Sequence, residues 1–410
     1  MALQFILGPS GAGKSEYIYE DIIRRTMQDE RENVIVLVPE QYSLEIQRKL
    51  VQKHPRGGSF QIDVIGFNRL AYRIFDELHI KPKKVLEDFG KSMLLRKAAQ
   101  EHKEELSLYA GSLDKAGFID EAKSLMSEIY QYDIPRERLR EALQKLDDSE
   151  EARVLARKLQ DMLVIFDAFE EKKGQSFIVA EQMLELLTAA AEQSELIAGS
   201  EIVLDGFTGF TPIQLNLISV LLRRAKKVTI VLTIDAATYE KKHVAEHELF
   251  ALTKQTIEHL LLTAEQAHVV VEPALFLGKD GCKRWSKGHP LAHLEQNLFR
   301  YPYRVGKDEE QAITITAYDT PAQELTGVAE QIRTLVMEQG YRYRDIAIVS
   351  GNLEETAEFA KRILPQYEIP YFIDMTMPVK NHPCVDALTH VLRIVDENFS
   401  YDSVFAFLKS

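Results

Sequence analysis

Eight consecutive residues near the amino terminus have the types and spacing of a phosphate-binding loop. Residues 8–15 read Gly-Pro-Ser-Gly-Ala-Gly-Lys-Ser and directly follow the apolar run 3–7. Small residues let backbone N–H groups turn onto phosphate oxygens, Lys14 adds a positive charge, and a helix starting near Ser15 points its positive end at the same place. The pattern predicts a nucleotide-binding loop between a strand and a helix. Binding and hydrolysis remain separate questions.

A magnesium nucleotide needs oxygen ligands as well as a loop for its phosphates. The Ser15 hydroxyl and Asp205, at the end of a later apolar run, are the predicted Mg²⁺ ligands of bound ATP. The full set of predicted nucleotide-binding residues is Gly8, Ser10, Gly11, Ala12, Gly13, Lys14, Ser15 and Asp205.

Composition limits the class of protein. The 410 residues are 45% hydrophobic, enough for two or three domains with cores of their own. The chain shows no apolar run of the ~20 residues that cross a bilayer and no signal-peptide pattern at its start. Its two cysteines suggest neither a disulfide framework nor a metal site, so we expect a cytoplasmic protein without a membrane partner. A net charge of −13 argues against nonspecific coating of nucleic acid but not against a local groove.

The elements that would position the loop are those of an α/β fold with a parallel sheet. Near-continuous apolar runs predict buried strands, and helical patterns follow them. The predicted strands after the first are 33–38, 60–65, 201–205 and 226–233, with helices over 15–29 and 212–224. Aromatic and basic residues come just after several strands, where open α/β sheets bind ligands.

The sheet is predicted to be discontinuous in sequence. Residues 86–197 lose the strand pattern and read as an inserted helical subdomain, so the first domain comprises 1–85 and 198–300. From 301 to 410 a second α/β domain begins, with strands at 312–317 and 346–349 around a helix from about 323 to 339. The last residues stop inside an apolar helical pattern, and we expect a fragment of a longer chain.

This order of elements resembles superfamily 1 helicases: a RecA-like parallel sheet that carries the phosphate loop, a helical insert, and the start of a second RecA-like domain. The local sequence is similar to the AddB subunit family of bacterial AddAB helicase/nucleases. The stretches that carry the resemblance are 8–15, 38–41, 65–71, 204–212, 340–348, 368–374 and 381–383.

The resemblance to AddB implies partners and a process. It implies an AddA-type motor subunit as the other half of a heterodimer, which acts on double-stranded DNA ends and single-stranded DNA in double-strand break repair and recombination. It also implies a nuclease domain with a four-cysteine iron-sulfur cluster, which we expect only in a C-terminal domain absent from this sequence. The fragment itself is expected to have no nuclease activity.

Two groups that a helicase motor uses are missing from their expected positions. Gly206 follows Asp205 where an acid usually orients the attacking water. Residues 349–352 read Val-Ser-Gly-Asn where active relatives tend to carry an arginine that reaches the γ-phosphate. Because the first strand starts at Leu3, we expect no glutamine loop of the kind that reads adenine in helicases. We expect ATP to bind with weak hydrolysis or none, and we assign no catalytic residue.

Single-stranded DNA is expected to cross the loops that follow the strands. Glutamine and arginine can hydrogen-bond to base edges, and aromatic rings can stack on bases. The resemblance implies that this surface helps to recognise a Chi-type sequence. The predicted DNA contacts are Gln41, Ser43, Phe67, Arg69, Tyr72 and Phe210. The aromatic members could equally be core residues.

Several alternatives stay open. The chain could be an active P-loop ATPase or a small-molecule kinase, which a second acid beside Asp205 would favour, or a scaffold for a motor subunit that binds neither nucleotide nor DNA. Trp285, between Lys283–Arg284 and Ser286–Lys287, could stack on a base or anchor a loop. His243, His247 and His259 lack an evident third metal ligand.

Overall fold

The computed structural model describes residues 1–29, 31–58, 60–81, 83–113, 115, 117–146, 149–174, 177–278, 282–286, 288–307, 312–375, 379 and 382–410. Asn381, in one of the stretches that carry the resemblance, lies outside the described residues. The chain divides into two compact units, Met1–Ala312 and Ile313–Ser410, and each is described by itself.

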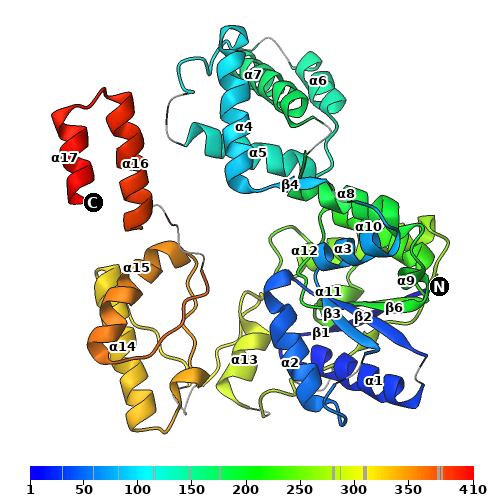
Figure 1. Ribbon diagram of the computed structural model, residues 1–410. Coiled ribbons are helices and arrows are strands. Elements are labelled where there is room, and N and C mark those ends of the chain that lie inside the picture. Colours follow the sequence, from blue (N-terminus) through cyan, green and yellow to red (C-terminus); the bar gives the residue numbers. More distant parts are fainter. Residues whose placement is uncertain are drawn as a thin grey trace. The chain divides into compact units, whose positions relative to one another are not determined.

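A parallel sheet forms the centre of the first unit (Figure 1). Its strands lie in the order β3-β2-β6-β7-β1-β8, with β9 also beside β1. The bounds are β1 Ala2–Gly8, β2 Asn33–Leu37, β3 Ile62–Ile65, β6 Ser200–Leu204, β7 Lys227–Thr233, β8 Val270–Val271 and β9 Leu275–Phe276. Because the strands are parallel, the loops after β1, β2, β3, β6 and β7 leave the same edge of the sheet.

Both faces of the sheet are buried, which explains why its strands read as continuous apolar runs. In β1, Leu3, Phe5 and Leu7 belong to one core and Ile6 to the core on the other face. Side chains alternate between faces along a strand, so one apolar run supplies both cores.

Helices cover each face (Figure 1). Helices α1 (Lys14–Gln28) and α2 (Ser43–Lys53) pack on the face that Ile6 joins. The opposite face is covered by α3 Phe67–Glu77, α8 Ala180–Ala191, α10 Pro212–Arg224 and α12 Ala251–Gln266. The α/β fold with a parallel sheet that the sequence predicts is therefore confirmed.

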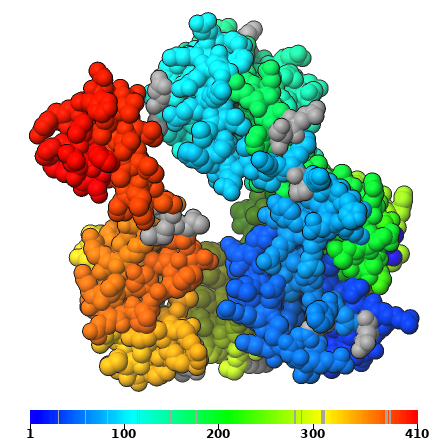
Figure 2. Space-filling model, in the orientation of Figure 1, coloured from blue at the N-terminus to red at the C-terminus, as the bar shows by residue number. Residues whose placement is uncertain are grey.

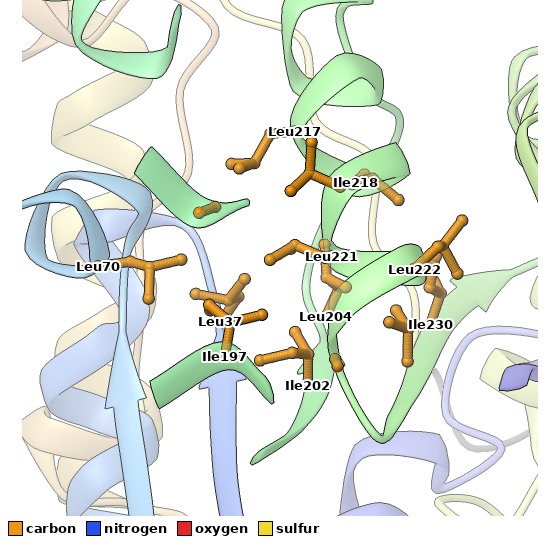
Figure 3. Packing of buried hydrophobic residues seen from close by; sticks show 14 of the residues in the cluster. Leu37, Leu70, Ile197, Ile202, Leu204, Leu217, Ile218, Leu221, Leu222 and Ile230 are labelled. Atoms are coloured by element: carbon orange, nitrogen blue, oxygen red, sulfur yellow. The ribbon is translucent and has the colours of Figure 1, made fainter. Parts of the chain in front are cut away.

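The larger core lies between the sheet and α10 (Figure 3). Leu37 of β2, Leu204 of β6 and Ile230 of β7 gather below Leu217 and Leu221 of the helix, and all five are at most 1% exposed. Burial of each such side chain stabilises the fold by about 1.5–3 kcal/mol. This packing fixes the strand ends that carry the candidate site.

The helical insert has a core of its own. It consists of β4 Lys84–Leu86, α4 Asp88–Glu101, α5 Phe118–Gln131, α6 Arg136–Gln144, α7 Glu150–Lys173 and β5 Phe177–Val179. Leu95, Met126 and Phe169 are central members of that core. The buried Lys91 ammonium pairs with Glu181 at 2.9 Å and so links α4 to α8. The sequence predicts the insert over 86–197; in the structure, α8 and α9 (Glu195–Ala198) contribute apolar residues to the sheet core.

Shorter elements complete the first unit. They are the 3₁₀ turns η1 Glu40–Tyr42 and η2 Lys103–Glu105 and the helices α11 Ala236–Glu240 and α13 Pro290–Asn297. Within the described residues, no helix of either unit is both long and apolar enough to cross a membrane.

The second unit is built from helices and extended segments. Its helices are α14 Pro321–Met337, α15 Leu353–Ile363, α16 Pro383–Asp396 and α17 Tyr401–Lys409, with 3₁₀ turns η3 Tyr343–Asp345 and η4 Leu364–Tyr367. Helices α14 and α15 share a small core. Helix α16 packs with α17, and Figure 2 shows the last residues of the chain as one red group.

The strands predicted at 312–317 and 346–349 do not form in this unit. No strand is assigned among the described residues of 313–410. Ile315 is 93% and Val349 92% exposed, and in the part of the unit that the structure describes neither segment has a paired strand beside it.

Candidate nucleotide-binding site

The phosphate loop connects β1 to α1 at the carboxyl edge of the sheet. Gly13 is the N-cap of α1 and has φ of +84°, a left-handed conformation that glycine adopts without strain. The loop tightens through a hydrogen bond of 3.3 Å from the Ala12 N–H to the Pro9 carbonyl. Ser10 is exposed and Ala12 is buried. The first N–H groups of α1 have no carbonyl partner within the helix, and they lie where the sequence predicts that phosphate binds.

Lys14 is folded back onto its own loop. Its ammonium donates to the carbonyls of Gly8 and Pro9, each at 2.9 Å. Burial lowers the pKa of this ammonium, and the carboxylates of Asp205 and Glu295 partly offset that effect. Lys14 thus has hydrogen-bond partners within its own loop, and it can exchange them for phosphate oxygens.

Asp205 lies at the same sheet edge, directly after β6. Its Oδ2 accepts a hydrogen bond of 2.6 Å from the Tyr19 hydroxyl, and its Oδ1 accepts one of 2.9 Å from the Gly206 N–H. Burial and the neighbouring Asp205 carboxylate raise the pKa of Tyr19, which keeps the phenol protonated. Asp205 is therefore held as an oriented carboxylate.

Tyr19 is a residue of the site that the sequence motif does not predict. It stands four positions after Ser15 on α1, so the two side chains share a helix face. Tyr19 is 3% exposed. The only sequence signal for Tyr19 is its spacing of four residues from the motif residue Ser15, which places both side chains on one face of α1.

The residues around Asp205 fit a magnesium ion carried by a nucleotide. Within the described residues, the half-buried Ser15 hydroxyl has no hydrogen-bond partner. Each Asp205 oxygen keeps acceptor capacity beyond its one hydrogen bond. Mg²⁺ prefers one or two protein oxygens with phosphate oxygens and water. The Ser15 hydroxyl and the Asp205 carboxylate are two protein oxygens of the kind that Mg²⁺ prefers.

Gly206 holds a backbone conformation that disfavours other residues. Its φ is +82°, and a Cβ there would lie 3.4 Å from Cδ of Pro39. The turn after β6 therefore favours glycine as the residue that follows Asp205.

Three aromatic rings form a row beside this turn. The ring centroids of Phe67 and Phe207 are 5.5 Å apart, and those of Phe207 and Phe210 are 5.2 Å apart. All three rings are half-buried and pack against the sheet core. The structure brings the predicted DNA contacts Phe67 and Phe210 together through Phe207, and it gives each ring a packing role as well.

The other predicted DNA contacts lie on the neighbouring loops and helix starts. Gln41 is exposed in η1, and Ser43, the first residue of α2, donates its hydroxyl to the Glu40 carbonyl at 2.9 Å. Arg69 and Tyr72 are exposed on α3. These side chains leave the same edge as the phosphate loop.

Glu40 joins two of the stretches that carry the resemblance, a contact that the sequence does not predict. Its carboxylate accepts a hydrogen bond of 3.1 Å from the Asn68 N–H and so caps α3. A Cβ on Gly66 would lie 2.2 Å from the Glu40 carboxyl carbon, so the glycine makes room for this cap.

Histidine positions show no common site. His243, His247 and His259 are all exposed. Among the described residues, no group of three or more His, Cys, Asp or Glu side chains is placed to hold a metal ion. Trp285 lies against the phosphate loop, with ring carbon Cζ3 3.5 Å from the position of a Cβ on Gly11.

Comparison with known proteins identifies similar sequences. Residues 5–295 match the family model described as "ADDB, N-terminal". The chain is also similar to proteins named as the B subunits of ATP-dependent helicase/deoxyribonucleases. It is 38% identical over 413 residues to the one from Lachnoclostridium phytofermentans, 33% over 410 to the one from Alkaliphilus metalliredigens and 31% over 410 to the one from Clostridium novyi. All of this chain is covered in each comparison, but it spans only 35–36% of each relative's length.

Proposed function

Because the chain belongs to the AddB family through its match to the N-terminal region of that family, we propose that it is the helicase-like part of the B subunit of an ATP-dependent helicase/deoxyribonuclease. In this proposal it binds Mg-ATP and single-stranded DNA in the cytoplasm and assembles with an AddA-type motor subunit. The complex acts on double-stranded DNA ends in break repair and recombination.

The arrangement of Lys14, Ser15 and Asp205 at one sheet edge is the observation that carries the proposal. The loop N–H groups and Lys14 bind the phosphates, and Ser15 and Asp205 hold the ion. When bound, Mg²⁺ neutralises phosphate charge and fixes the geometry of the triphosphate. Tyr19 orients the Asp205 carboxylate toward that position.

We propose that hydrolysis at this site is weak or absent. A water-orienting acid would have to occupy position 206, where the backbone has φ of +82° and the residue is glycine. Catalysis of phosphoryl transfer depends largely on positioned charge, so the site can hold ATP without turning it over quickly.

Single-stranded DNA is proposed to cross the loops after β2, β3 and β6. The exposed ring of Tyr72 and the half-buried rings of Phe67 and Phe210 offer faces on which bases can stack, worth about 1–3 kcal/mol per base. Gln41 and Arg69 can hydrogen-bond to base edges. With a net charge of −13, bulk electrostatic attraction is small, so base contacts carry more of the binding. Such contacts would let the protein scan for a Chi-type sequence.

Nuclease activity and the iron-sulfur cluster of the family are proposed to belong to regions of the relatives that this chain does not span. Cys282 and Cys384 cannot supply four thiolate ligands.

Titration with a fluorescent ATP analogue in the presence of Mg²⁺ tests the nucleotide site. Lys14→Ala should weaken binding about tenfold or more, because a charged hydrogen bond to phosphate is lost. The control is Lys226→Ala, which removes an exposed lysine just before β7, at the opposite edge of the sheet. Equal affinity of wild type and Lys14→Ala would overturn the site. If the protein binds neither nucleotide nor DNA, the alternative of a scaffold for a motor subunit is favoured.

A further inference from the structure

A short segment from a distant part of the sequence lies directly on the phosphate loop. We call Cys282–Ser286 the strap. The Cys282 thiol donates to the Ser10 carbonyl with an Sγ···O distance of 3.4 Å. The Arg284 N–H donates to the Gly11 carbonyl at 3.3 Å. Two polar contacts thus attach the strap to the loop backbone.

The strap and the loop are in van der Waals contact. A Cβ on Gly11 would lie 2.4 Å from the Cys282 sulfur, closer than atoms can approach. A Cβ on Gly13 would lie 3.2 Å from Cδ of Lys283. These two glycines therefore have a second role besides the turn of the loop, because they leave the space that the strap fills.

The strap also carries two positive charges without acidic partners. Lys283 and Arg284 are exposed, and neither forms an ion pair within the described residues. The Arg284 guanidinium carbon lies 6.0 Å from the centroid of the Trp285 ring, at the outer limit of a cation–π contact.

We propose that Lys283 and Arg284 are phosphate-binding residues of the nucleotide site, so that a triphosphate bound to the loop is held between Lys14 and the strap. This inference rests on the proposed nucleotide binding and adds residues outside the phosphate-loop motif. An arginine suits the role because its planar group can contact two phosphate oxygens at once. The role is binding; no step of hydrolysis is assigned to the strap.

Trp285 provides a direct reporter of this contact. It is the one tryptophan of the chain, and its ring lies against Gly11. Intrinsic tryptophan fluorescence should therefore change when a triphosphate occupies the loop. Trp285→Phe should abolish that signal while keeping an aromatic ring in the strap.

The test compares Lys283→Ala/Arg284→Ala with the control pair Arg31→Ala/Lys226→Ala. The control removes two exposed cations that precede β2 and β7, at the opposite edge of the sheet. Binding of the fluorescent ATP analogue is measured in competition with inorganic triphosphate and, separately, with adenosine. The strap variant should bind ATP and inorganic triphosphate about tenfold or more weakly than the control, with adenosine unaffected. Lys283→Arg/Arg284→Lys should restore most of the affinity.

Each outcome has a distinct meaning. If the strap variant and the control bind triphosphate equally, the strap inference is wrong. If the strap variant binds more tightly, the strap is a cover that ATP displaces, and the inference is wrong as well. If wild type binds no nucleotide by either fluorescence signal, the proposed function fails first. If Lys14→Ala weakens binding but the strap variant does not, only the strap inference fails.

Discussion

The hydroxyl of Tyr19 donates to Oδ2 of Asp205 at 2.6 Å, across 186 residues of sequence. This bond joins the helix that follows the phosphate loop to the strand end that supplies the predicted magnesium ligand. Both side chains are buried, at 3% and 4% exposure.

Removal of that hydroxyl should weaken both the fold and the magnesium site. In Tyr19→Phe, Asp205 loses a buried donor, and the free energy of unfolding should fall by about 1–3 kcal/mol. Affinity for ATP should fall about tenfold in Mg²⁺ and much less in EDTA, since a ligand's orienting partner is lost. Urea unfolding and nucleotide titration measure the two effects. Tyr17→Phe, on the exposed side of α1, is the control; identical behaviour of the two variants would contradict the orienting role.

Nucleotide affinity should depend on alkaline pH through Lys14. Burial lowers the pKa of this ammonium below the ordinary 10.5. Affinity should be full below the lowered pKa and fall as the pH rises through it, because the neutral amine no longer attracts phosphate. Titrations from neutral to alkaline pH measure the effect. In Lys14→Arg the charge persists, so the alkaline loss should disappear; the same pH profile in both proteins would exclude Lys14 as its source.

An acid restored after Asp205 should not create a motor. Gly206→Glu places a side chain at φ of +82° and should lower the free energy of unfolding by about 1–2 kcal/mol. ATP turnover should stay low with single-stranded DNA present, because an absent arginine contact alone is worth about 10³ or more in rate. Urea unfolding and ATPase assays of wild type, Gly206→Ala and Gly206→Glu test this. DNA-stimulated turnover at helicase rates in wild type or Gly206→Glu would refute it.

Recognition of a short DNA sequence should be separable from movement of the complex along DNA. Arg69→Ala or Gln41→Ala, in the complete complex with its motor partner, should leave unwinding speed unchanged but abolish pausing at one short DNA sequence. Single-molecule tracking on DNA with and without that sequence measures both quantities, and Arg31→Ala serves as the control. If pausing survives both substitutions, Gln41 and Arg69 do not belong to the recognition surface.

The buried part of the fold could be predicted from the sequence, and parts of the rest could not. A strand predicted at 33–38 is Asn33–Leu37, and the helix predicted at 212–224 is α10 itself, because both carry apolar patterns set by burial. Strands β8 and β9 are two residues long each, too short for any pattern. The sequence ends the insert at 197, and in the structure α8 packs on the sheet core. Because α8 is as helical in pattern as α7, the pattern alone does not show which core each helix joins.

The site divides in the same way. The phosphate loop and Asp205 follow from local motifs and strand ends. Tyr19 and the strap do not, because their contacts join residues that are far apart in sequence: the Cys282 to Ser10 bond spans 272 residues. The spacing of residues within a short stretch of sequence does not predict such long-range contacts. Binding of nucleotide and DNA by the predicted residues stays a prediction.

The sheet order has a consequence for synthesis on the ribosome. Strand β1 pairs with β7, with Leu3 opposite Val228, so the strand that leads into the phosphate loop is made more than 200 residues before its neighbour. At translation rates of about 5–20 residues per second, this delay lasts about 10–45 s. Throughout that interval a nascent chain holds an apolar strand with open edges, the kind of segment that chaperones shield. Synonymous codons that slow translation of the insert should therefore lower the yield of native protein, although they change no amino acid.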